Sequence, residues 1–235
     1  MISVVCFKWK KRADSAWPVS NIEYSAEHVH RLKNMVWRNL AFPHRFICVT
    51  DDASDIDPRI EIIPLWDKHL DLGGCYNRLY VFSPDMKKLL GDRFICIDLD
   101  CVITGDITPL VTRSEDFVIN SYKPLVTSIV DQHYNGGMFM MTAGARRQVW
   151  DTFDPKRSPG AIMRAKREGT CIGTDQAWVR LILGKNEARW TEADGVYEAR
   201  QVRDKLPPGA RIVFFAGSRD PLTSTGYQWV REHWR

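Results

Sequence analysis

The stretch Arg93-Phe-Ile-Cys-Ile-Asp98-Leu-Asp100-Cys-Val-Ile-Thr104-Gly105-Asp106 determines the fold that we expect, because an apolar run in it ends abruptly in two carboxylates. Residues 94–97 carry no charge and include aromatic and β-branched side chains, which is typical of a strand buried on both faces. Residues i and i+2 of an extended chain point to the same side, so Asp98 and Asp100 can face one point beyond the strand end. That place is the ligand crevice of an open α/β sheet.

Two carboxylates at such a place suggest a cation site. Hard oxygen donors suit Mg²⁺ or Mn²⁺, and a cation of this kind can in turn hold a diphosphate. The alternative is that Asp98 and Asp100 cap a turn, and a single D-x-D motif leaves both interpretations open.

The composition indicates a globular protein with one large core. The chain has 235 residues, of which 44% are hydrophobic and 26% charged, and we expect a single domain over residues 1–235. The net charge of +4 is too small and too dispersed to indicate nucleic-acid binding, although a basic cluster at residues 8–12 fits an anionic ligand. No apolar run is long enough for a membrane span, and the run Ile2 to Phe7 is too short for a signal sequence, so we expect a soluble, cytoplasmic protein.

The six cysteines show no C-x-x-C pair, and several lie inside apolar runs. This pattern predicts buried free thiols rather than disulfides or a zinc site.

Alternating strand and helix signals predict an α/β fold with a mostly parallel sheet flanked by helices. Strands are predicted at residues 2–7, 45–50, 60–65, 94–97, 116–122, 138–141 and 212–215. Helices are predicted at residues 26–40, 75–82, 84–90, 145–153, 161–168, 174–183 and 226–235, with a short one after Gly105.

Several local signals refine this prediction. Ser25 is expected to cap the first long helix, in which His28 and His30 are expected on the surface. Ser83 is expected to cap the next helix, with Pro84 at its first position. The aromatic and basic tail from residue 226 is expected to pack as a terminal helix, with an acceptor or membrane-surface contact as the alternative.

Two further segments are candidates for a ligand site. Asn135-Gly136-Gly137 precedes an apolar strand, and its glycines either allow a close approach to a ligand or form a simple turn. Asp175 and Gln176 open a helix whose end can face a pocket, although a carboxylate there also interacts favourably with the helix dipole.

Together these segments resemble the retaining glycosyltransferases of the glycogenin and lipopolysaccharide galactosyltransferase kind (family 8-like), which have the GT-A, Rossmann-like fold. The resemblance covers most of the chain and rests on several motifs in the family's order. These motifs are Tyr76-Asn-Arg78-Leu79, the D-x-D strand with Gly105-Asp106, Tyr134-Asn135-Gly136-Gly137-Met138, Asp175-Gln176, and Phe214-Phe-Ala-Gly217-Ser-Arg219-Asp220-Pro221.

The resemblance implies transfer of a hexosyl group, with retention, from a nucleotide sugar such as a UDP-sugar to a glycan, lipid or other hydroxyl acceptor. It implies that Asp98 and Asp100 bind Mn²⁺ or Mg²⁺, which bridges the donor diphosphate. Arg78 is implied as a contact to the donor phosphate or sugar. Peripheral membrane contact is compatible with a lipid-linked acceptor, and no nucleic-acid partner is implied.

The resemblance also implies the residues that line the sugar site. Asn135 with the backbone of Gly136 and Gly137 would line it, Asp175 would hold sugar hydroxyls, and Gln176 would lie under the anomeric carbon. Gly217 and Arg219 are implied as further donor-binding residues.

The last motif departs from the family pattern. Phe214 replaces the family's histidine, which is its third metal ligand, and Asp220 replaces a phosphate-binding lysine. A cation held by two carboxylates, diphosphate and water remains reasonable, because Mg²⁺ keeps several waters when bound. Arg219 is adjacent to the altered lysine position and is expected to supply the missing charge.

Two alternative functions remain open from the sequence. The segment from Ile97 to Val102 also resembles the first motif of haloacid dehalogenase-like phosphatases, in which the first aspartate is a nucleophile. That interpretation requires a later lysine and acidic pair, for which the sequence offers no convincing candidate. A non-catalytic nucleotide-sugar binder is the other alternative, motivated by Phe214 and Asp220.

Overall fold

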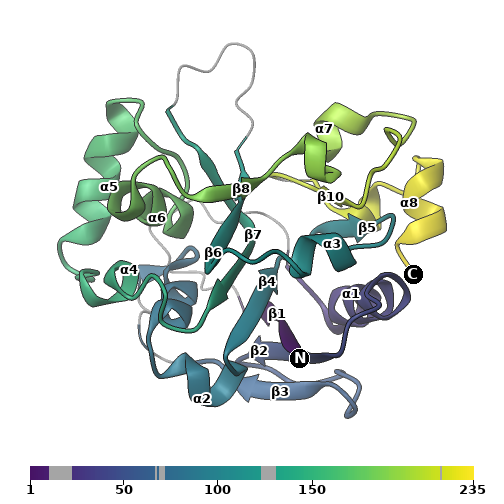
Figure 1. The fold of residues 1–235 in the computed structure, drawn as a ribbon, viewed down its shortest axis with the longest axis horizontal. Helices are drawn as coiled ribbons and strands as arrows, with labels where there is room; N and C mark the ends of the chain where they lie inside the picture. Colours follow the sequence, from purple (N-terminus) through teal and green to yellow (C-terminus); the bar gives the residue numbers. More distant parts are fainter. Residues whose placement is uncertain (11–22, 67, 69–71, 123–130, 218) are drawn as a thin grey trace.

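The computed structural model of the protein describes residues 1–10, 23–66, 68, 72–122, 131–217 and 219–235. Within them, a seven-stranded sheet of order β3-β2-β1-β4-β7-β6-β8 forms the centre, and a three-stranded sheet of order β5-β10-β9 lies beside it (Figure 1). The strands of the larger sheet are β1 (Ile2–Lys8), β2 (His44–Thr50), β3 (Glu61–Pro64), β4 (Arg93–Ile97), β6 (Phe117–Ser121), β7 (Tyr134–Thr142) and β8 (Ala188–Trp190). Those of the smaller sheet are β5 (Cys101–Ile103), β9 (Val196–Glu198) and β10 (Ile212–Phe214).

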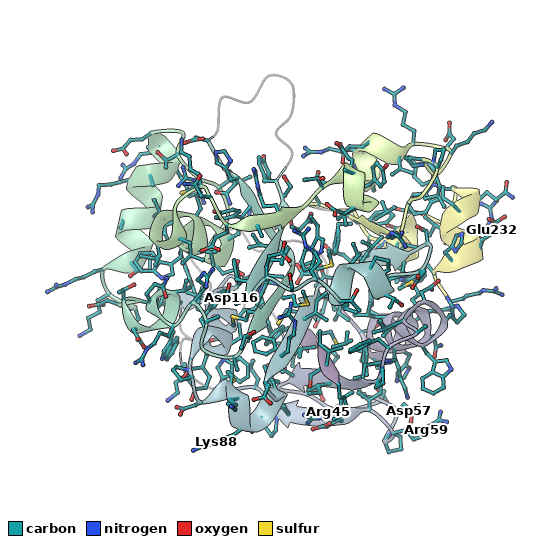
Figure 2. All side chains as sticks on the ribbon, viewed as in Figure 1. Arg45, Asp57, Arg59, Lys88, Asp116 and Glu232 are labelled. Carbon is teal, nitrogen blue, oxygen red and sulfur yellow. The ribbon has the colours of Figure 1, made fainter. Side chains whose placement is uncertain are left out.

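Helices flank the larger sheet, as the sequence predicts (Figure 1). The α-helices are α1 (Ala26–Asn39), α2 (Met86–Leu90), α3 (Thr108–Val111), α4 (Gln148–Asp151), α5 (Ser158–Arg167), α6 (Asp175–Leu183), α7 (Ala199–Val202) and α8 (Gln228–His233). Short 3-10 helices are η2 (Tyr76–Phe82), η3 (Glu192–Asp194) and η4 (Pro221–Thr223). Charged side chains such as Arg45, Lys88 and Glu232 lie at the periphery (Figure 2).

The predicted mostly parallel sheet and its central strand are confirmed. Strand β4 pairs with β1 in parallel and with β7 in antiparallel orientation. The chain runs outwards from β1 through β2 to β3 and then returns to β4 on the other side of β1. The junction of β1 and β4 is therefore the point where the strand order reverses, which is where open α/β sheets bind ligands.

The alternation of side chains along the strands creates two apolar cores. In β1, Val4 and Cys6 join the core that includes α1 and the smaller sheet, whereas Val5 and Phe7 join the core that includes η2 and α6. Successive side chains of a strand point to opposite faces, so a strand buried on both sides must be apolar throughout. This is why the central strands read as continuous apolar runs.

The smaller sheet was only partly predicted. Strand β10 was expected, but β5, β9 and the short helix α7 were not, and neither was β8 at the edge of the larger sheet. Each of these elements has three or four residues, too few for a recognisable pattern. Because β5 follows β4 directly, Asp98 and Asp100 lie in the link between the two sheets, where Phe215 donates a backbone hydrogen bond to Asp100 O at 2.8 Å.

The segment Asn135-Gly136-Gly137 lies within β7 and does not precede it, which corrects the predicted strand start at residue 138. The register between β6 and β7 shifts here: Ile119 is opposite Phe139, but the next residue, Asn120, is opposite Asn135. The extra residues form a bulge, and bulges turn backbone and side chains out of the regular ladder. The bulge faces the cleft described below.

The prediction for His28 was wrong. Ser25 does cap α1, but His28 is buried, and its Nε2 lies 3.1 Å from Asp220 Oδ2 near the C-terminal end of the chain. His28 Nδ1 accepts a hydrogen bond from the backbone of Ser25 at 3.1 Å. The helical periodicity gave no sign of this contact, because the partner is distant in sequence.

Other local predictions have mixed outcomes. Helix α2 begins at Met86 after Asp85, so Ser83 and Pro84 belong to the turn before it. Helix α8 is packed as predicted, with Trp229 and Trp234 buried. The six cysteines are free. Five are buried, and Cys75 is half-buried as a residue although its thiol is shielded from water. In the described part of the chain, no helix has the length and apolar character to cross a membrane.

Candidate active site

A cleft of about 560 Å³ opens where β4 ends, and it gathers most of the residues that the sequence singles out. Its walls come from η2, the β4–β5 link, the β7 bulge, the start of α6 and the end of β10. The predicted site residues that line it are Arg78, Asp98, Asp100, Asn135, Gly137, Asp175, Gln176 and Gly217. Residues far apart in sequence thus meet at one place.

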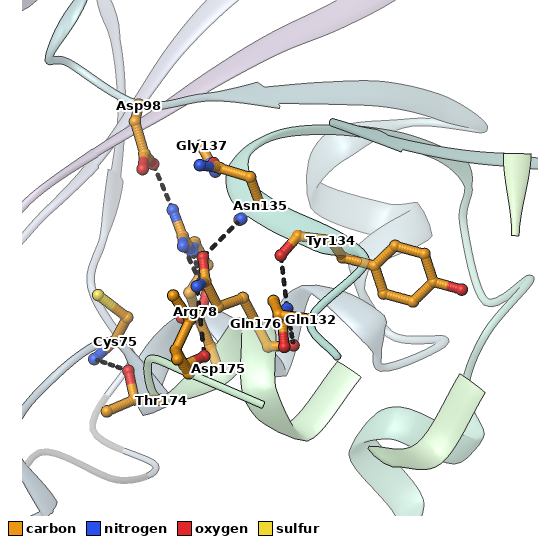
Figure 3. A network of polar contacts seen from close by, with 12 residues as sticks. Cys75, Arg78, Asp98, Gln132, Tyr134, Asn135, Gly137, Thr174, Asp175 and Gln176 are labelled. Atoms are coloured by element: carbon orange, nitrogen blue, oxygen red, sulfur yellow. Dashed lines mark hydrogen bonds and ion pairs between the residues drawn. The ribbon is translucent and has the colours of Figure 1, made fainter. Parts of the chain in front are cut away.

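Arg78 holds two carboxylates of this cleft together (Figure 3). Its Nε donates to Asp175 Oδ2 at 2.8 Å, and its Nη1 donates to Asp98 Oδ1. The side chain of Arg78 is only 6% exposed. Burial alone would lower its pKa, but the charges of Asp175 and Asp98 more than compensate and raise the pKa of Arg78 well above its ordinary value.

Gln176 is fixed at both ends of its carboxamide (Figure 3). The Oε1 atom accepts a hydrogen bond from the backbone N–H of Gly136 at 3.0 Å, and Nε2 donates to Ile172 O at 3.2 Å. These two contacts define which end of the amide is oxygen. The first turn of α6 is therefore tied to the β7 bulge through this side chain.

The glycines of the bulge are required by close packing. A Cβ atom on Gly136 would lie 2.7 Å from Arg78 Nη2, and one on Gly137 would lie 3.2 Å from the Phe214 ring. Gly137 also donates its N–H to Asn135 Oδ1 at 2.7 Å, which orients the Asn135 amide. Gly136 itself does not line the cleft, but it packs closely against Arg78 and Gln176.

The two carboxylates of the D-x-D motif both line the cleft. Burial raises the pKa of Asp100 well above its usual value, and the negative charge of Asp98 raises it further. Tyr24 opposes this effect through a hydrogen bond to Asp100. Two carboxylates this close repel one another, which favours a cation between them.

Hard oxygen donors and an excess of negative charge fit Mg²⁺ or Mn²⁺ better than a softer metal. Four carboxylates and two guanidinium groups line the cleft. Within the described residues, however, no group of three or more His, Cys, Asp or Glu side chains is arranged to hold a metal ion. Any cation here would therefore take its remaining ligands from water or substrate.

A second polar cluster lines the opposite side of the cleft and was not anticipated from the sequence. Glu198 ends β9 and Arg200 lies in α7, and Arg200 Nε is 2.6 Å from Glu198 Oε2. Tyr122, which directly follows β6, shares a hydrogen bond with Arg200. A three-residue strand followed by a four-residue helix leaves no sequence pattern by which to find this cluster.

A second cavity of about 350 Å³ lies at the ends of β1 and β2. It is lined by Lys8, Trp9, Lys10 and Tyr24 from one side and by Asp52 from the other. Lys8 is buried, and its Nζ donates to Asp52 O at 2.7 Å. Since Tyr24 also hydrogen-bonds Asp100, it connects this cavity with the larger cleft.

Some predicted residues lie elsewhere. Arg219 is exposed and does not line either cavity, and Asp220 is buried against His28. Of the basic cluster at residues 8–12, Lys11 and Arg12 are outside the described residues. Cys75 lines the cleft, but burial raises the pKa of its thiol to about 12, so it is not a thiolate near neutral pH.

The sheet order, the flanking helices and the cleft at the strand reversal define a GT-A fold. No known family model and no curated protein matches the sequence. Among solved structures, the galactosyltransferase LgtC in complex with donor and acceptor sugar analogues is similar, with a TM-score of 0.59 and 12% identity over 98% of this chain and 93% of that one. A structure of an active-site mutant of LgtC gives a TM-score of 0.56 and 11% identity, over 94% of this chain and 89% of that one.

The apo form of the glycosyltransferase GlyE of Streptococcus pneumoniae TIGR4 is similar as well, with a TM-score of 0.60 and 12% identity. The match spans 99% of this chain but 61% of the GlyE chain. At these identities the likeness establishes the fold, and the fold is the one that the motifs predict.

Proposed function

We propose that the protein is a glycosyltransferase that moves a hexosyl group from a nucleotide sugar, such as a UDP-sugar, to a hydroxyl acceptor with retention of configuration. The observation that carries this proposal is the network of Asp98, Arg78, Asp175 and Gln176 in one cleft. The similarity of the fold to LgtC and GlyE, which are glycosyltransferases, supports it.

In this proposal Asp98 and Asp100, which lie between β4 and β5 and line the cleft, would hold Mn²⁺ or Mg²⁺. Such a cation, when bound, neutralises the diphosphate that leaves with the nucleoside. The charge of the cleft supports a cation, because a diphosphate would otherwise meet four carboxylates and only two guanidinium groups. Arg78 acts by fixing the positions of Asp98 and Asp175.

The sugar would lie between the β7 bulge and α6. Asn135 is oriented by Gly137 and can bind sugar hydroxyls, and so can Asp175. Gln176 presents a fixed amide oxygen, which can stabilise positive charge at the anomeric carbon but is a poor nucleophile. We therefore favour attack by the acceptor oxygen on the face from which the phosphate departs. The anomeric C–O bond to phosphate breaks, and the departing phosphate oxygen takes the acceptor proton.

The second cavity is the proposed place for the nucleoside. Trp9 offers an aromatic surface for a base, and Lys8 and Lys10 offer positive charge. Tyr24 lies between this cavity and Asp100, so a nucleoside there would place its diphosphate near the D-x-D carboxylates.

The phosphatase alternative gains no support from the cleft, because no lysine is among the described residues that line it. The non-catalytic binder remains to be distinguished by experiment. A thermal-shift screen of nucleoside diphosphate sugars with and without Mn²⁺ should identify the donor, because a ligand of the native state raises the melting temperature.

Donor hydrolysis under Mn²⁺ then tests catalysis. We expect slow release of nucleoside diphosphate that is lost in Asp100→Ala, with an unchanged fold by circular dichroism. Exposed Asp85→Ala is the matched control and should retain hydrolysis. Donor binding without any turnover would indicate a binder, and release of phosphate from an aryl phosphate would indicate a phosphatase.

A further inference from the structure

The cluster of Tyr122, Glu198 and Arg200 has no part in the donor chemistry proposed above, although it lines the same cleft. The Glu198 side chain is only 4% exposed and that of Arg200 25% exposed. Burying a carboxylate is costly unless it is paired, and the contact with Arg200 provides the pairing. The wall of the cleft therefore carries a half-buried ion pair, in which Glu198 is buried and Arg200 is partly exposed.

The cluster lies across the cleft from the donor residues. Arg200 belongs to α7 and Gln176 to α6, and Figure 1 shows these two helices on opposite sides of the upper end of the central strands. The cleft is also lined by Phe214, Phe215 and Gly217. An acceptor that approaches the anomeric carbon beside Gln176 would therefore have the Glu198–Arg200 wall on its other side.

The charge of this wall selects the kind of acceptor. Both carboxylate oxygens of Glu198 are buried, whereas Arg200 is partly exposed. Arg200 therefore presents its donor nitrogens to the cleft, and Glu198 neutralises its charge. Neutralised donor nitrogens of this kind match the hydroxyl oxygens of a sugar, which accept hydrogen bonds. A phosphorylated or carboxylated acceptor would instead meet a cleft in which carboxylates outnumber guanidinium groups.

We infer that Glu198 and Arg200 form the acceptor subsite and select a neutral, polyhydroxylated saccharide over an anionic one. The assignment of this subsite to an acceptor rests on the proposed glycosyltransferase function. The preference for neutral saccharides rests only on the ion pair and on the charge of the cleft.

The test measures saccharide binding without donor by saturation-transfer NMR. The probes are the methyl glycosides of glucose, galactose and N-acetylglucosamine, each compared with an anionic counterpart, a uronic acid or a 6-phosphate. The native protein should contact at least one neutral glycoside and bind its anionic counterpart about tenfold more weakly, because carboxylates outnumber guanidinium groups in the cleft. Absence of contact from all neutral glycosides would overturn the inference.

Glu198→Gln provides the sharper test, because it keeps the shape of the side chain but leaves Arg200 with a net positive charge. We expect the preference for the neutral glycoside to be lost, with about tenfold tighter binding of its anionic counterpart to Arg200 and little change for the neutral glycoside. Arg157→Met, which removes an exposed arginine far from the cleft lining, is the control and should change neither.

If Glu198 has only a structural role, Glu198→Gln should weaken the binding of neutral and anionic ligands equally. That result would contradict the inference. Failure of the proposed function is separately visible, because donor hydrolysis would then be absent while saccharide binding and its changed preference in Glu198→Gln persist. Hydrolysis with no change of saccharide preference in Glu198→Gln would overturn the inference alone.

Discussion

At the scale of single residues, Arg78 is the most constrained side chain of the site. It is nearly fully buried, yet it contacts the carboxylates of both Asp98 and Asp175. Removing one member of such a group leaves the others as uncompensated buried charges. The arginine therefore supports both the stability of the fold and the geometry of the cleft.

We expect Arg78→Met to lower the free energy of unfolding by about 3 kcal/mol, since it breaks a buried ion pair. Urea denaturation measures the change. The double variant Arg78→Met with Asp175→Asn should recover part of the loss, because it removes the unpaired carboxylate as well. Equal stability of the single variant and the native protein would contradict this assignment.

Gln176→Glu replaces an amide with a carboxylate of the same shape. The variant has no N–H to donate to Ile172 O, and it adds a negative charge next to Asp175. We expect donor hydrolysis to fall about 100-fold, because loss of the bond to Ile172 O and repulsion from Asp175 displace the side-chain oxygen from its position. Exposed Gln148→Glu is the control and should hydrolyse donor at the native rate. A Gln176→Glu protein that retains full hydrolysis would exclude a role for the amide.

At the scale of elements, a buried polar contact is among those that join the first helix to the last part of the chain. Asp220 caps η4 by accepting the N–H of Leu222 at 2.8 Å, and it also contacts His28 of α1. In the motif resemblance this position belongs to a phosphate-binding lysine. Here the aspartate lines neither cavity and forms contacts within the fold.

Asp220→Ala should lower the free energy of unfolding by about 2 kcal/mol, because it removes a cap and leaves His28 without its carboxylate. Asp220→Asn keeps the capping oxygen and should lose about half as much. Chemical denaturation measures both, and donor affinity should be the same in all three proteins. A change of donor affinity in Asp220→Asn would mean that the residue reaches the ligand after all.

The elements also show what the sequence can and cannot predict. The strand before Asp98 and the helix after Asp175 were predictable, because their patterns are local and long enough to read. The bulge around Gly136 was predicted as a segment before the strand, since register is decided by the neighbouring strand β6. The Glu198–Arg200 pair was missed because its strand is short and its partner β10 lies farther along the chain.

At the scale of the whole molecule, buried thiols make the free energy of unfolding depend on pH in the alkaline range. Burial raises the pKa of Cys6, Cys75, Cys96, Cys101 and Cys171, to about 12 in Cys75. In the unfolded chain these thiols ionise near pH 8.5. The folded state therefore binds more protons than the unfolded state above that pH, and stability falls as pH rises.

We expect the urea midpoint to be constant between pH 7 and 8 and to fall steadily from pH 8.5 upwards. Each thiol that stays protonated in the folded state contributes about 1.4 kcal/mol per pH unit to the slope. Cys75→Ser should reduce the slope of stability against pH by the contribution of one thiol. Donor hydrolysis should persist in this variant. A midpoint that is independent of pH up to 10 would show that these thiols ionise in the native fold.

The position of Tyr24 has a consequence for ligand size. Tyr24 lines the second cavity and hydrogen-bonds Asp100, which lines the cleft, so the two sites are adjacent. Their combined length favours a ligand that spans both. A compound long enough to anchor in both gains from attachment at two points, because binding of one end raises the effective concentration of the other. A nucleoside or a sugar alone occupies only one of the two sites, so it should bind more weakly than a ligand that occupies both.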